Sequence, residues 1–178
     1  MKQTRRLAFS AVLVSIMLVL GYLESFLPVS PIPGIKLGLS NSVLIISLYW
    51  LGAPISFQLM LVKNVLLGVL LGNPMLIPYS VAGGILSLTL MSILFRKKGV
   101  SPVGVGIAGG VTHNVGQVAV AMIILQTPSL VFYLGLLMPA GALMGIITGT
   151  VAKTLMRHFP PIKTLRQQPI TQAEEKQS

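Results

Sequence analysis

The chain has 178 residues, of which 53% are hydrophobic and only 9% are charged, and its formal net charge is +10. Soluble domains carry about 25% charged residues, whereas this chain has no aspartate and three glutamates, at positions 24, 174 and 175. This composition excludes a water-soluble globular domain and predicts an all-α integral membrane protein.

Six apolar segments follow one another along the chain, separated by short stretches rich in proline and glycine that are typical of turns. A membrane-spanning helix needs roughly 20 apolar residues. The predicted helices are 7–26, 36–51, 54–72, 75–95, 103–125 and 130–156. We expect a six-helix transmembrane domain over residues 1–157 and a polar, disordered cytoplasmic tail over residues 158–178. The first segment lacks a small-x-small cleavage site, so we interpret it as a retained helix.

The second segment is shorter than the others. Fifteen residues separate Lys36 from Gly52, which is about 22 Å of helix and too short to cross a bilayer alone. We therefore expect the preceding stretch SPIPGIK to dip into the outer leaflet, where it is covered by protein.

Lysine and arginine gather in three places: before the first helix, between the fourth and fifth, and after the sixth. With six spans, all three fall on one side of the membrane. Cytoplasmic loops carry the excess of basic residues, so the pattern predicts a multi-pass cell-membrane protein with both termini in the cytoplasm. The net charge then requires no nucleic-acid partner.

Polar residues interrupt the apolar segments near their centres. Lys63 is the middle residue of the third segment, too far from either end for its side chain to reach water, and Asn64 follows it. In the fifth segment His113 and Gln117 share one helix face, and Asn114 lies about 100° round from it. Intramembrane ionisable residues usually mark a pathway or a site. The alternative is interhelical hydrogen bonding that only fixes the packing.

Glycines recur at four-residue spacing in the fifth and sixth segments, a pattern that lets helices approach closely in lipid. They predict packing within the bundle, or alternatively contact with a partner subunit. These helix-packing positions are Gly106, Gly110, Gly141, Gly145 and Gly149.

We expect the polar residues to line one cavity that opens outward beneath the segment 27–36, with Glu24 as a mobile acid at its rim. Its lining is expected to be net positive and to bind an anionic or amphipathic ligand. The candidate substrate-binding residues are Glu24, Lys36, Asn41, Lys63, Asn64, His113, Asn114 and Gln117. The chain has no cysteine, and we expect no metal and no cofactor.

Three stretches of the sequence carry a resemblance to a known family: GIKLGLSNSV (34–43), LVKNVLLGVLLG (61–72) and GGVTHNVGQVAVA (109–121). Over roughly residues 5–157 the chain resembles the Gx transporter family, which is also labelled heptaprenyl diphosphate synthase component I. That family in turn is similar to the substrate-binding S components of energy-coupling-factor transporters. The resemblance implies six helices, cytoplasmic termini and a ligand pocket toward the outside under the first loop.

Two functions from different classes remain open. The first is a transporter subunit that binds a small anionic or prenylated substrate and is energised by ATP-driven coupling subunits or an ion gradient. The second is a non-catalytic membrane partner of a polyprenyl diphosphate synthase subunit. Chain-elongating synthases hold diphosphate through magnesium on aspartates, so we expect no catalysis by this chain alone. A purely structural membrane subunit is a third possibility, against which the insertion cost of Lys63 argues.

Overall fold

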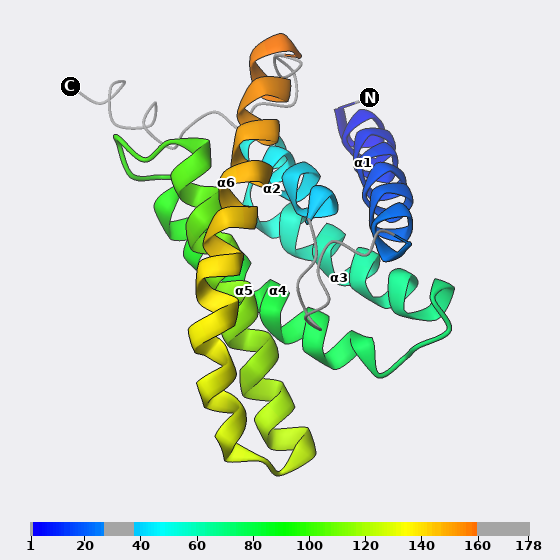
Figure 1. Cartoon of the computed structure of the whole chain (residues 1–178). Helices are drawn as coiled ribbons and strands as arrows, with labels where there is room; N and C mark the ends of the chain where they lie inside the picture. Colours follow the sequence, from blue (N-terminus) through cyan, green and yellow to red (C-terminus); the bar gives the residue numbers. More distant parts are fainter. Residues whose placement is uncertain (1, 27–37, 160–178) are drawn as a thin grey trace, which may run out of the picture.

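The fold is a bundle of six α-helices, seen in a computed structural model that describes residues 2–26 and 38–159 (Figure 1). Five of the helices are long and apolar enough to cross a membrane. The described residues contain no strand. The all-α prediction is therefore confirmed, and the helices are α1 (Lys2–Ser25), α2 (Leu39–Leu51), α3 (Ala53–Leu70), α4 (Leu76–Leu94), α5 (Pro102–Leu125) and α6 (Leu134–His158).

The exception in length is α2, which has 13 residues and is about 20 Å long. As predicted, it is too short to span a bilayer by itself. It is also the most enclosed helix, since Val43 to Leu48 form an unbroken buried run. Gly52 joins it to α3 with a φ of 85°, a conformation that residues with a side chain rarely adopt. The expected dip of SPIPGIK into the membrane lies outside the described residues.

The start of the last helix differs from the prediction. A 3-10 helix, η1, covers Pro128–Tyr133, and α6 begins at Leu134 rather than at residue 130. Gln126 ends α5 in the left-handed conformation, and Pro128 stands in the first turn of η1. Hydropathy alone does not separate a 3-10 turn from the α-helix that continues it.

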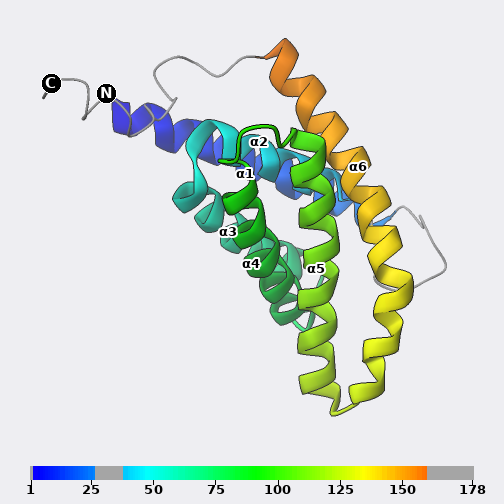
Figure 2. The ribbon, with the colours of Figure 1, turned by 90° about the vertical axis from the view of Figure 1, so that its left-hand side faces the viewer.

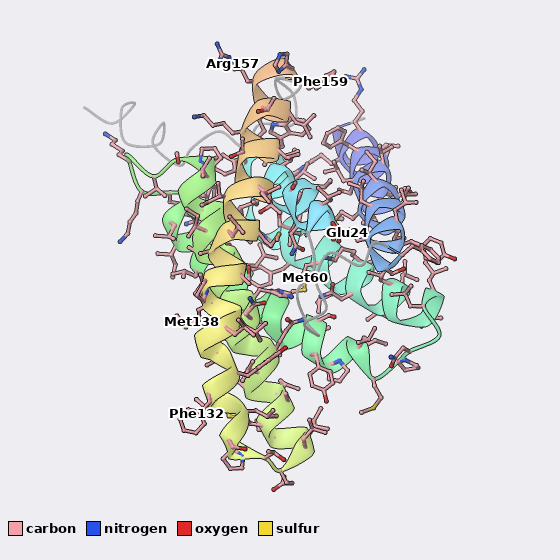
Figure 3. The ribbon with its side chains drawn as sticks, viewed as in Figure 1. Glu24, Met60, Phe132, Met138, Arg157 and Phe159 are labelled. Carbon is pink, nitrogen blue, oxygen red and sulfur yellow. The ribbon has the colours of Figure 1, made fainter. Side chains whose placement is uncertain are left out.

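The described parts of the three basic regions lie toward the same end of the bundle. Figures 1 and 2 both place the first turn of α1, the α4–α5 connection and the last turn of α6 at the upper end, away from the α5–α6 connection. Arg5, the side chains of residues 96–98 and Arg157 are exposed there. Beyond the opposite end of α6, Phe132 of η1 is 84% exposed (Figure 3). This arrangement is compatible with one basic, water-facing end and a lipid-covered body.

Large apolar side chains cover much of the outer surface. Val65, Leu66, Val69 and Leu70 of α3 are exposed, as are many residues of α1 and α6. An exposed apolar surface of this extent needs lipid around it. The interior holds a smaller set of fully enclosed residues, which includes Met17, Leu48, Leu51, Met60 and Leu88. The predicted polar tail began at residue 158, but His158 is the last residue of α6, and residues 160–178 lie outside the described part of the chain.

Candidate binding cavity

A cavity of about 120 Å³ lies in the middle of the bundle and is lined by residues from all six α-helices. The structure brings together seven of the eight predicted site residues. These are Glu24 of α1, Asn41 of α2, Lys63 and Asn64 of α3, and His113, Asn114 and Gln117 of α5. Lys36, the eighth, lies outside the described residues.

Lys63 is the buried cation of this cavity, with 5% of its side chain exposed. Its ammonium donates to Oδ1 of Asn41 at 3.1 Å and to Oγ of Ser40 at 3.4 Å. Both acceptors stand in the first turn of α2. The N-terminal end of a helix is electropositive, so α2 offers this lysine side-chain oxygens rather than backbone carbonyls. The ammonium thus contributes one positive charge to the cavity beside the start of α2.

Glu24 joins the C-terminal end of α1 to the start of α2. Its side chain is 7% exposed, and its Oε1 accepts a hydrogen bond from the backbone N–H of Leu39. The sequence predicted a mobile acid at the rim. That prediction is wrong, because the carboxylate satisfies a backbone donor at a helix N-terminus that has no side-chain cap of its own. Figure 3 shows Glu24 at this end of α1, with Met60 nearer the centre of the bundle.

Two asparagines tie helices together at the cavity wall. Asn64 Nδ2 donates to the carbonyl oxygen of Ser80 in α4 at 2.8 Å and contacts Met60 Sδ at 3.3 Å. Asn114 Nδ2 donates to the carbonyl oxygen of Leu137 in α6 at 2.6 Å. Each amide therefore links two neighbouring helices by a hydrogen bond. Both asparagines stabilise the helix packing and also line the cavity.

His113 and Gln117 lie against α4. Gly83 leaves room for them: a methyl group added to its Cα would be 2.7 Å from the His113 carbonyl oxygen and 3.0 Å from Gln117 Cγ. The two side chains share the face of α5 that the spacing predicted, and both reach the cavity. They supply polar groups on the side of the cavity nearest α4.

The charge of the described lining is balanced. Lys63 and Glu24 are its two charged side chains when His113 is neutral. The sequence predicted a net positive lining with Glu24 only at its rim, whereas within residues 2–26 and 38–159 Glu24 lies in the lining together with Lys63. The cavity therefore suits a ligand that carries a single anionic group better than one that carries several negative charges.

The predicted packing glycines lie between α5 and α6. A methyl group on Gly145 would be 2.5 Å from the carbonyl oxygen of Gly106, and one on Gly141 would be 2.7 Å from that of Gly110. Gly149 meets the backbone of Val103 in the same way, at 2.7 Å. The glycine face is thus occupied by a helix of the same chain, and four of these glycines also form part of the cavity wall.

Several lining residues had no signal in the sequence. The acceptor for Asn64 is a backbone carbonyl, at Ser80, which no residue type reveals. Thr148, Ser87 and Gly21 also line the cavity, but isolated serine, threonine and glycine are common in membrane helices. Only contact between helices that are distant in sequence identifies them.

Comparison with known proteins places the chain in a family. The family model described as heptaprenyl diphosphate synthase component I matches residues 13–155. The chain belongs to this family. The match begins within α1 and ends near the last turn of α6, so it contains every described residue of the cavity. Neither a curated protein nor a solved structure matches the chain. Membership in the heptaprenyl diphosphate synthase component I family confirms the resemblance noted in the sequence.

Proposed function

We propose that this protein is a membrane-embedded binding subunit of a transporter, which holds a small anionic substrate or the anionic headgroup of a prenylated substrate beside Lys63. The observation that carries the proposal is a lysine at the centre of a membrane helix that forms the wall of a cavity. Placing lysine there costs roughly 2.5 to 3.5 kcal/mol on insertion scales. The hydrogen bonds to Asn41 and Ser40 offset part of this cost, and a ligand with an anionic group beside the ammonium would offset more of it.

The size of the cavity limits what it holds. An engineered apolar cavity of about 150 Å³ accepts benzene, and this cavity is about 120 Å³. It therefore accommodates a compact polar group with a handful of heavy atoms. The polar groups of the lining that would surround it are the Lys63 ammonium, the Asn41 and Gln117 amides and the His113 ring.

The location of the cavity supports access from outside the cell. It borders the last turns of α1 at Gly21 and Glu24 and the first turn of α2 at Gly38 to Asn41. These two helix ends precede and follow residues 27–37 in the sequence, and the C-terminal end of α1 is opposite its basic N-terminus. If the basic regions are cytoplasmic, the cavity opens toward the outer side, and both chain termini are cytoplasmic.

Ligand extraction tests this proposal. The wild type, Lys63→Met and Lys153→Met are purified from native membranes in mild detergent, and bound small molecules are identified by mass spectrometry. Lys153 is exposed on α6, so its variant is the matched control for loss of one lysine. We expect the same compound on the wild type and on Lys153→Met and its loss from Lys63→Met. Equal retention by Lys63→Met would overturn the assignment of the site.

The family description favours a second function, that of a non-catalytic membrane component of a polyprenyl diphosphate synthase. Because the chain has no aspartate, it lacks the ligands with which such enzymes hold magnesium diphosphate, so its role would be to deliver or receive the lipid. A pull-down from native membranes separates the two. Recovery of an ATPase with a coupling protein supports transport, and recovery of a soluble prenyl diphosphate synthase supports the second function.

A further inference from the structure

A second, smaller hollow of about 20 Å³ lies at the boundary between α3 and α4. Asn64, Leu67 and Ser80 line both hollows. The remaining lining of the smaller hollow is Gly68, Leu71 and Leu76, which is apolar. The cavity in the protein centre thus adjoins a second hollow beside the turn that joins α3 to α4.

We propose that the substrate is a lipid whose anionic headgroup occupies the Lys63 cavity and whose apolar tail leaves between α3 and α4. This inference rests on the proposed binding function and names the class of its ligand. A tail of several isoprene units cannot fit a cavity smaller than the one that accepts benzene. The exposed apolar side chains of Val65, Leu66 and Val69 on the outer face of α3 indicate that the helix lies against the apolar environment that such a tail requires.

Backbone contacts close the boundaries on the other side of the cavity. Between α5 and α6, a methyl group on Gly145 would lie 2.5 Å from the Gly106 carbonyl oxygen. Between α4 and α5, methyl groups on Gly83 and Gly116 would lie 2.7 Å and 2.9 Å from backbone oxygens of the facing helix. No side chain can rotate to open these boundaries, so a passage there requires whole helices to separate.

Side chains close the boundary between α3 and α4. Gly84 of α4 faces the sulfur of Met60, which a methyl group there would approach to 2.6 Å, and Gly68 of α3 faces the side chain of Ile77. Methionine is unbranched and adapts easily to new packing. Leu67 also packs against Gly21 of α1, but the smaller hollow lies on its α4 side. Rotation of a few side chains therefore opens a route to lipid here.

Asn64 stands at the junction of the two hollows and holds the route closed. Its amide donates to the Ser80 carbonyl oxygen of α4 at 2.8 Å. An interhelical hydrogen bond within a bilayer contributes about 0.6 kcal/mol on average. Ser80 lies within α4, which continues to Leu94. The amide can release Ser80 and turn to the headgroup, so the same residue serves the closed and the ligand-bound states.

A reversible lock across α3 and α4 tests the route. The chain has no cysteine, so Gly68→Cys with Ile77→Cys introduces its only thiols, at positions where a methyl group on Gly68 would lie against Cγ1 of Ile77. Binding of dimethylallyl phosphate, geranylgeranyl phosphate and hexadecyl phosphate is measured in nanodiscs with the pair oxidised and reduced. The two single variants control for the substitutions, and a mass measurement verifies the disulfide.

We expect the disulfide to weaken binding of the long-chain probes at least tenfold and to leave the short probe unchanged. Comparison of geranylgeranyl with hexadecyl phosphate identifies whether the tail is prenyl or straight-chain. Equal long-probe affinity in the two redox forms would overturn the α3–α4 route. Binding of the short probe alone, still dependent on Lys63, would overturn the lipid assignment but leave the proposed binding function standing. Failure of all three probes would also remove the lipid assignment, while the extraction experiment still decides the function.

A second variant guards against poor folding of the double cysteine protein. Leu76→Phe fills the smaller hollow. It leaves every residue of the Lys63 cavity unchanged, because Leu76 lines only the smaller hollow and not the cavity. It should weaken geranylgeranyl phosphate binding several-fold and spare dimethylallyl phosphate. Undiminished binding of both probes would contradict the route.

Discussion

Replacement of Gly145 by alanine should push α5 and α6 apart. The added methyl group would lie 2.5 Å from the carbonyl oxygen of Gly106 and 2.6 Å from Cα of Ile107. Both are backbone atoms, so no rotamer change relieves the clash, and the helices must separate by about 1 Å to restore ordinary van der Waals distances.

The size of the effect follows from this separation. A gap of 0.5–1 Å forfeits roughly a quarter to a half of each atom-pair contact along the interface, and overpacked sites typically lose about 1–3 kcal/mol. For a chain of this length such a loss lowers the melting temperature by about 2 to 12 °C on the scale of soluble proteins. The assay is thermal unfolding of the purified protein in one detergent.

Gly135→Ala in the same helix is the matched control, since nothing lies within 4 Å of a methyl group placed there. It should be neutral or stabilising by up to about 1 kcal/mol, because alanine favours helix more than glycine does. Equal melting temperatures for the two variants would refute the view that Gly145 is a close-contact position.

Two further predictions concern topology and the polar contacts between helices. Reporter tags at residue 97 and at the C-terminus should both be cytoplasmic and a tag at residue 73 external, because basic residues are retained inside; tags at 97 and at the C-terminus on opposite faces would contradict the six-helix topology. Asn114→Ala removes the 2.6 Å bond to the Leu137 carbonyl and should cost about 0.6–1.7 kcal/mol of stability. Thr89→Ala, which removes only an exposed bond within α4, should have no such effect in the same unfolding assay.

The helices were predictable because their apolar length and their turn residues are local signals. Ser101 and Pro102 illustrate this, since the serine hydroxyl accepts a hydrogen bond from the Gly104 N–H at 3.2 Å and the proline occupies the first turn of α5. The 3-10 helix before α6 was not predictable from hydropathy, because a 3-10 turn and an α-helix of the same composition are equally apolar.

The grouping of the site was predictable only in part. Lys63, His113 and Gln117 are conspicuous because an ionisable or amide side chain in an apolar segment has few other reasons to be there. The residues that these side chains contact were not predictable from the sequence. Lipid-facing and buried surfaces of a membrane helix are both apolar, so periodicity does not tell which helices meet. The burial of Glu24 depends on the backbone N–H of Leu39, a donor that residue type does not reveal.

The measurement that most directly tests the central claim, that Lys63 holds the ligand, is a paired series of stability and affinity on Lys63→Met and Lys63→Arg with the compound found by extraction. Methionine keeps much of the side-chain volume and removes the insertion cost of the charge, so the variant should be at least as stable as the wild type. Its affinity should fall by about 1.5 to 3 kcal/mol, roughly tenfold to more than a hundredfold, and arginine should restore only part of it because its planar fork does not replace a compact ammonium. Loss of stability with full affinity in Lys63→Met would contradict the account and make Lys63 a packing residue.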